Sequence, residues 1–107
     1  MNDIDKVWQR ILDYSTNTKE KPADENLIFE TSKLKIKFWI QKIDNHTVLP
    51  ANERGSKLRR ISINVIKEDI ANNRGGNQNM RPKDYNSPAP SYRCVLLKDS
   101  RIWLKNK

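Results

Sequence analysis

Cysteine and histidine are almost missing from this 107-residue sequence, and each shortage excludes a class of site. Cys94 is the only cysteine, which excludes an internal disulfide framework and a cysteine-based zinc site. His46 is the only histidine, which excludes the HExxH zinc motif. The three glycines do not form a glycine-rich phosphate loop. We therefore expect no metal and no cofactor.

Long apolar runs are also lacking. Apolar residues make up 36% of the chain and charged residues 32%, and the mean hydropathy is −0.90. This composition excludes a membrane span and suits one small core, so residues 1–107 are interpreted as a single domain. Residues 1–5 lack the basic and apolar regions of a secretory signal, which predicts a cytoplasmic location.

Positive charge is the strongest feature of the sequence. The chain has 21 Lys and Arg against 13 Asp and Glu, a net charge of +8, and its isoelectric point is about 9.8. Residues 1–30 hold four Lys and Arg against seven Asp and Glu, a net charge of −3, which leaves +11 for residues 31–107. Clustered on one face, such charge attracts a polyanion; the alternative is a solvated lysine-rich surface.

The first half of the chain has the pattern of a helix followed by strands. Apolar residues recur every three or four positions over 3–14, which predicts an amphipathic helix capped by Asn2 or Asp3. Residues 15–26 have no apolar period and are predicted to form a solvated loop. Short strands are predicted at 27–31, 34–41 and 47–49, the last one ended by Pro50.

The second half has weaker patterns. Ser62 is a suitable N-cap for a helix that ends near residue 72. Residues 73–90 are rich in Gly, Pro and Asn, which predicts a long irregular connection that orders only on binding. In the last segment, residues 91–104, helical and strand spacing both fit; we favour a short helix because Pro90 and Ser91 resemble a helix cap.

These elements predict an α+β domain, with a small antiparallel sheet of two or three strands, an N-terminal helix, a central helix and a short C-terminal helix. Two stretches carry a resemblance to a known class: Phe29-Glu30-Thr31 with Phe38, and Pro90-Ser91-Tyr92 with Leu96, Asp99, Arg101 and Ile102. In this pattern the chain resembles small bacterial and phage α+β domains of winged-helix-like layout, found alone or beside restriction and anti-phage functions. The resemblance implies a DNA-binding or defence-related role and transfers no catalytic residue.

Lys35, Lys37 and Trp39 alternate with the apolar residues of the predicted strand 34–41. Two ammonium groups beside an exposed indole can contact phosphates and stack a base. The alternative is that the N-terminal helix or the C-terminal tail covers Trp39, and that the lysines only keep a sheet edge soluble.

Four cations, Arg54, Lys57, Arg59 and Arg60, lie within seven residues directly before the predicted central helix. Such a loop can hold phosphate, with the first amide groups of the helix and the Ser62 hydroxyl adding to the guanidinium groups. The alternative is a mobile basic loop without a ligand.

Arg74, Asn77 and Arg81 belong to the Asn-rich connection. Asn can pair with adenine edges, and Arg can enter a groove or hold phosphate. The alternative is an inert surface loop.

Candidates for catalysis are few. His46 with Asp44 could act as a base and its orienting group in a ribonuclease-like reaction, but a single His in a hairpin turn is more often a turn residue. Cys94 lies among apolar residues and is interpreted as a small buried side chain.

We therefore expect a nucleic-acid-binding module without enzymatic activity, with double-stranded DNA favoured over RNA as its partner. Phosphate contacts are assigned to Lys37 and to the four cations at 54–60, and base contacts to Arg74 and Asn77. A protein-interaction module, such as a phage or bacterial inhibitor of a nucleic-acid-processing protein, is the alternative, and a small basic ribonuclease is a third reading.

Overall fold

The computed structural model describes residues 4–104, and the chain begins there with a helix, α1 (Ile4–Asp13). Val7, Trp8 and Ile11 are buried, as the apolar spacing predicts. The predicted helix is therefore confirmed, while its proposed caps, Asn2 and Asp3, lie outside the described residues.

Four antiparallel strands form one sheet in the order β1 (Phe29–Glu30), β2 (Lys37–Asp44), β3 (Thr47–Asn52) and β4 (Ile61–Ser62). The α+β class is confirmed. The fourth strand goes beyond the predicted two or three, because two residues after a basic stretch show no alternation.

The bounds of all three predicted strands differ in the structure. β1 is shorter than the predicted strand 27–31, because a 3-10 helix, η1 (Glu25–Leu27), ends just before it, and β2 continues to Asp44. β2 begins at Lys37, and Leu34 and Lys35 lie in the preceding turn, where Lys35 has a φ of +55°. β3 continues through Pro50 to Asn52. β4 pairs only with Thr47 and Val48, so β3 has a free edge at Pro50, a position that tolerates a residue without an N–H.

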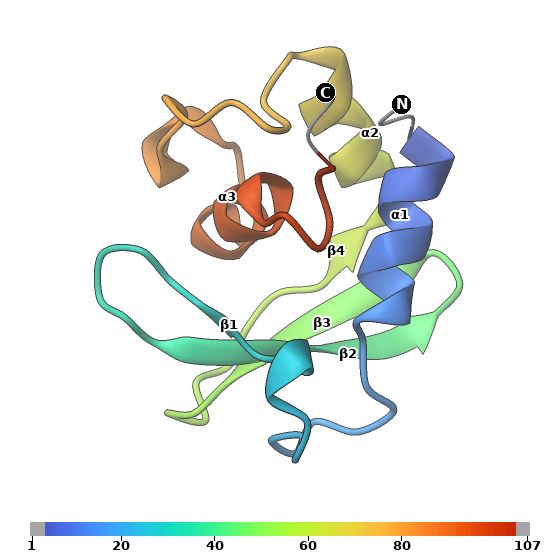
Figure 1. Ribbon diagram of the computed structural model, residues 1–107, viewed down its shortest axis with the longest axis vertical. Helices are drawn as coiled ribbons and strands as arrows, with labels where there is room; N and C mark the ends of the chain where they lie inside the picture. Colours follow the sequence, from blue (N-terminus) through green and yellow to red (C-terminus); the bar gives the residue numbers. More distant parts are fainter. Residues whose placement is uncertain (1–3, 105–107) are drawn as a thin grey trace.

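Helices α1, α2 (Ile63–Ala71) and α3 (Pro90–Lys98) cover one face of the sheet, and residues 15–26 pass beneath the other (Figure 1). The core lies on the helix side. There the ring of Phe38 stacks on Phe29 with centroids 5.6 Å apart and meets the edge of Tyr92 at 4.7 Å. The helix predicted from residue 91 is thus confirmed, and it supplies one wall of the core.

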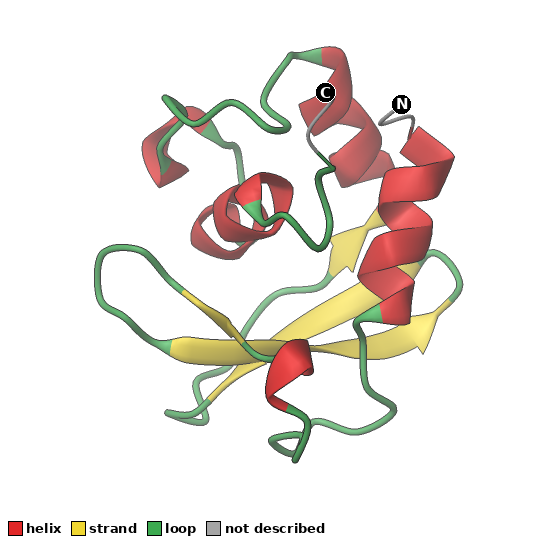
Figure 2. Cartoon of the chain, viewed as in Figure 1, coloured by secondary structure: helices red, strands yellow, loops and turns green. Residues whose placement is uncertain are grey.

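The connection at 73–90 is packed, contrary to the expectation that it orders only on binding. It contains a short 3-10 helix, η2 (Pro82–Asp84), and Tyr85 is 5% exposed (Figure 2). Gly75 and Gly76 lie under the Trp103 ring, where a Cβ atom at either position would overlap it. A polar network described below holds this segment, and its members are far apart in the sequence.

Candidate nucleic-acid interface

A groove of about 610 Å³ runs along the second half of β3, between the loop 15–26 and the connection from β3 to β4. Residues 49–51 of β3 contribute its apolar floor. Lys19 and Glu20 reach it from the loop beneath the sheet, and Lys57 and Arg60 from the connection between β3 and β4. We call this the basic groove and residues 54–60 the basic loop; cations from two separate segments meet here.

Asn52 holds the start of the basic loop. Its buried side-chain oxygen accepts hydrogen bonds from the backbone N–H groups of Arg54 and Ser56, both at 3.1 Å. Gly55 has a φ of +67°, the left-handed conformation that favours glycine, and its N–H donates to the Asn52 carbonyl at 3.1 Å. The amide nitrogen of Asn52 donates to the Tyr92 hydroxyl at 3.1 Å, which ties the loop to α3. The loop therefore leaves the sheet along a defined path.

The four cations of the basic loop point to solvent without a partner inside the protein. Arg54, Lys57, Arg59 and Arg60 are all exposed. Within residues 4–104, no ion pair or hydrogen bond engages any of their side chains. The nearby carboxylate of Glu53 instead accepts the backbone N–H of Lys37 at 3.2 Å. Four positive charges in seven residues thus remain uncompensated.

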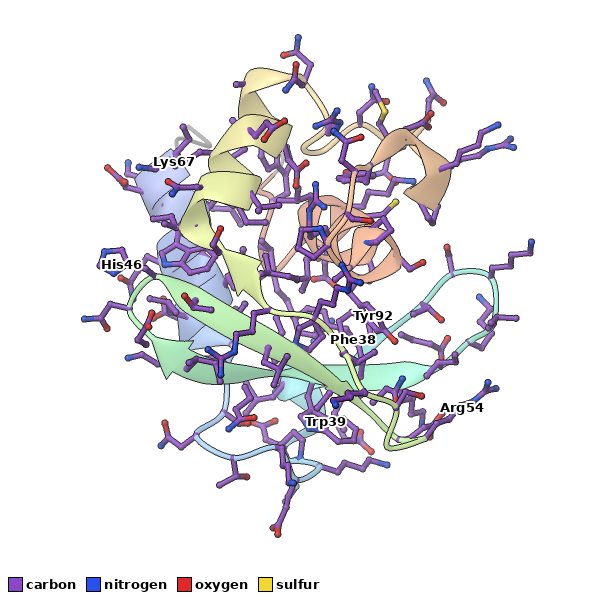
Figure 3. The ribbon with its side chains drawn as sticks, turned by 180° about the vertical axis from the view of Figure 1, so that it is seen from behind. Phe38, Trp39, His46, Arg54, Lys67 and Tyr92 are labelled. Carbon is purple, nitrogen blue, oxygen red and sulfur yellow. The ribbon has the colours of Figure 1, made fainter. Side chains whose placement is uncertain are left out.

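Trp39 is not an exposed stacking platform. It is 4% exposed, and its indole Nε1 donates to the carbonyl of Lys19 at 2.9 Å. Two backbone hydrogen bonds between Thr16 and β2 fix the covering segment. The N–H of Thr16 donates to the carbonyl of Ile40 at 2.7 Å, and its carbonyl accepts the N–H of Lys42 at 2.8 Å. Figure 3 shows Trp39 on the opposite side of the sheet from Phe38 and Tyr92. The cover comes from the loop predicted to be solvated, and neither the N-terminal helix nor the C-terminal tail supplies it.

Lys35 and Lys37 do not line the basic groove. Lys35 is exposed in the turn before β2. Lys37 pairs across the sheet with Glu30 and lines a separate pocket of about 700 Å³, in which Glu25 and Asp99 accompany the cations. Acidic neighbours therefore reduce the positive potential around Lys37.

At the N-terminus of α2, where the sequence predicts a phosphate site, two of the amide groups already have partners. Ser62 is the N-cap, as predicted, and its hydroxyl oxygen accepts the N–H of Val65 at 3.4 Å. The N–H of Ile63 donates to the carbonyl of His46 at 2.8 Å. His46 and Arg54 lie at opposite ends of the sheet (Figure 3), so this helix end cannot act together with the start of the basic loop.

The segment 73–81, which contains Arg74, Asn77 and Arg81, lies on the helix side of the sheet (Figure 1), and none of the three lines the basic groove. The guanidinium of Arg74 contacts the Asp69 carboxylate at 3.3 Å, and its Nε donates to the Asp84 carbonyl at 3.1 Å. The side-chain oxygen of Asn77 accepts the N–H of Asn79 at 3.0 Å in a local turn. Arg81 is exposed. The structure therefore does not bring these residues together with the basic loop, and Arg74 is already engaged in holding the fold.

His46 occupies the hairpin turn between β2 and β3, where a carboxylate oxygen of Asp44 accepts its backbone N–H at 2.8 Å. Asp44 thus holds the turn and does not orient the imidazole. Cys94 is buried, as predicted, and burial raises the pKa of its thiol. Over residues 4–104, no three His, Cys, Asp or Glu side chains form a group that could hold a metal ion.

Sequence reasoning missed Lys19 and Glu20 in the groove and Asn52 beneath it. The dipeptide Gly55-Ser56 indicates a turn after Asn52, but nothing local connects Lys19 to β3. Comparisons with protein-family models, with curated proteins and with solved structures gave no match. None of the helices in the described part of the chain is long and apolar enough to cross a membrane.

Proposed function

We propose that the protein binds nucleic acid through its phosphate backbone, with Arg54, Lys57, Arg59 and Arg60 as the main contacts and duplex DNA as the expected form. One observation carries the proposal: these four side chains are exposed and unpaired on one short, anchored loop beside a groove. Arginine and lysine in this setting neutralise phosphates and release counterions.

The surroundings of the loop favour a long polyanion over a small anion. Lys19 brings a further cation to the basic groove from a separate segment, so positive charge extends across it. Like charges held this close repel one another, and a chain of phosphates relieves that repulsion. Among the residues that the structure describes, Glu20 is the only acidic one that lines the groove.

No aromatic residue within 4–104 is fully exposed, which favours a duplex over a single strand. Trp8 and Trp39 are each 4% exposed, and Trp103 covers Gly75 and Gly76. Sequence-tolerant binding of single strands relies on bases stacking on aromatic side chains. Contacts to phosphate position a protein on a duplex with little reading of the bases, so we expect weak sequence preference.

The test is fluorescence anisotropy with labelled duplex DNA, single-stranded DNA and RNA over a range of salt concentrations. We expect the duplex to bind with a logarithmic salt slope of about −3.6 for four phosphate contacts. The double variant Arg59→Ala, Arg60→Ala should reduce that slope by about 2.

The matched control is Lys67→Ala with Lys83→Ala, which removes the same charge from exposed positions on α2 and η2. This control should leave the salt slope unchanged. Equal losses in the two double variants would mean that net charge, and not the basic loop, drives binding. No binding to any of the three probes at low salt would reject the proposal.

A further inference from the structure

A second surface lies on the helix side of the sheet, between the turn 31–36 and η2. It contains an apolar pocket of about 290 Å³, lined mainly by Leu34, Ile36, Pro82 and Tyr92. Leu34 is 63% exposed, the largest exposure of any large hydrophobic side chain in the described residues. We call this the Leu34 pocket. It is an apolar site open to solvent in a chain that is otherwise strongly charged.

The walls of the Leu34 pocket are held in place. The N–H of Thr31 donates to the carbonyl of Ile36 at 2.9 Å, and the Thr31 hydroxyl accepts the N–H of Ile36 at 3.0 Å. On the other side, the Tyr92 ring rests against Phe38, and its hydroxyl accepts the hydrogen bond from Asn52. The exposure of Leu34 is therefore a feature of an ordered turn and does not come from a frayed strand.

Exposed cations lie in two of the stretches of chain that line the Leu34 pocket. Lys33 lines it, Lys35 follows in the same turn, and Arg81 and Lys83 flank Pro82; all four are exposed. Asp84 is the one acidic residue in the stretches 31–36 and 81–84, and its carboxylate accepts the N–H of Arg81 at 2.8 Å. The surface thus combines an apolar centre with a positive rim.

We propose that the Leu34 pocket binds one large apolar side chain of a partner protein, presented on an acidic segment. An acidic segment complements the rim, and an apolar side chain removes the pocket lining and Leu34 from water. A phosphate backbone would complement the rim but leave the apolar centre unfilled, which favours protein over nucleic acid. The residues that line this pocket and those that line the basic groove do not overlap, so the inference does not depend on the proposed function.

The probes are two fluorescein-labelled nonapeptides, each with four glutamates on either side of a central residue, which is phenylalanine in one and alanine in the other. We expect the phenylalanine peptide to bind the full chain at least about fivefold more tightly at low salt, the scale of one buried apolar side chain. Leu34→Ser should abolish that difference. Because Leu34 is mostly exposed, the variant should keep the wild-type circular dichroism spectrum.

The matched control is Leu104→Ser, at a leucine that is 49% exposed; it should bind both peptides as the wild type does. Arg59→Ala with Arg60→Ala should also leave the preference for phenylalanine unchanged, which separates this site from the basic groove. Equal binding of the two peptides would overturn the proposal, since charge alone would then explain binding. A Leu34→Ser variant that loses affinity for duplex DNA and keeps the peptide preference would assign this surface to nucleic acid and also overturn it.

Discussion

Asn52 shows how one side chain connects the two sides of this sheet. Its oxygen accepts two backbone N–H groups of the basic loop, and its amide nitrogen donates to Tyr92 on the helix side. A buried amide that makes all three of these hydrogen bonds strongly constrains the positions of the groups it bonds. The path of the basic loop and the wall of the Leu34 pocket therefore depend on the same residue.

Cys94 should be unreactive in the folded protein. It is 2% exposed, and burial raises the pKa of its thiol, which reduces the fraction of reactive thiolate. We expect the native protein to react with a thiol reagent such as DTNB more than about a hundredfold more slowly than in urea, since reaction requires opening of the structure. Comparable rates in the two conditions would mean that the thiol is accessible in the native state.

Asp99 should lose its contribution to stability in acid. Burial by itself would raise the pKa of its carboxyl, but hydrogen bonds from Arg101 at 2.7 and 2.8 Å outweigh burial and hold the pKa below its usual value. A carboxyl with a lowered folded pKa stabilises the protein above about pH 4, and this stabilisation is lost as the pH falls through the folded pKa.

Arg101→Ala should therefore raise the pKa of Asp99, because the side-chain hydrogen bonds and the positive charge that oppose burial are lost. The backbone N–H of residue 101, which donates to the carboxylate at 2.9 Å, is kept in the variant. An NMR titration of the Asp99 carboxyl carbon measures the shift. Arg59→Ala, which removes an exposed cation elsewhere, is the control and should leave this titration unchanged. An unchanged Asp99 midpoint in Arg101→Ala would contradict the assignment.

The connection 73–90 is held by a buried charge network between α2 and α3. Arg93 of α3 pairs with Asp69 of α2, and its Nε donates to the carboxylate at 2.8 Å. The same guanidinium donates to the carbonyls of Asn86 and Pro88 within the connection. The Tyr85 hydroxyl donates to the Arg74 carbonyl at 3.0 Å. Removing one partner would leave the opposite charge buried and unpaired.

Asp69→Asn should lower the free energy of unfolding by about 3–5 kcal/mol, the cost of an unpaired buried Arg93. Urea unfolding measures the change. Glu68→Gln is the control: Glu68 is the exposed neighbour on the same helix, and its loss should change stability by less than about 0.5 kcal/mol. Similar effects of the two substitutions would mean that the buried pair adds nothing beyond an ordinary surface charge.

The molecule as a whole uses the two faces of its sheet differently. Three helices bury the apolar face and form the core, and the loop 15–26 covers Trp39 on the other face and reaches the basic groove (Figure 1). The basic groove is lined by the loop 15–26, β3 and the basic loop, whereas the Leu34 pocket is lined by the turn 31–36, η2 and α3. Both surfaces could be occupied at the same time by separate partners.

A core this small should be sensitive to the loss of a single apolar side chain. Ile11 is fully buried where α1 packs on the core. Ile11→Ala should lower the free energy of unfolding by about 2–5 kcal/mol. This is a large part of the total free energy of unfolding of a typical domain, which is about 5–15 kcal/mol. Gln9→Ala, on the exposed side of α1, should cost less than about 0.5 kcal/mol. Urea unfolding that does not distinguish the two variants would contradict the packing of α1.

Features that depend on neighbouring residues could be predicted from the sequence. The buried residues of α1 recur every three or four positions within that helix. Ser62 caps α2 by accepting the N–H of Val65, only three residues later. The exposure of the basic loop follows from its charge, because isolated cations are costly to bury. The sequence alone predicts these features because the interactions behind each of them join residues only a few positions apart.

Features that depend on distant partners required the three-dimensional structure. Trp39 alternates with two lysines, and the sequence leaves open whether it is exposed or covered by the N-terminal helix or the C-terminal tail. Lys19, which lies 20 positions earlier, covers it instead and accepts its hydrogen bond. Asp69 and Arg93 are 24 positions apart, and their pairing gives an irregular, polar connection a fixed place. Periodicity records which faces of a segment are apolar, whereas the choice of what covers a face is made by the free energy of the whole packed chain.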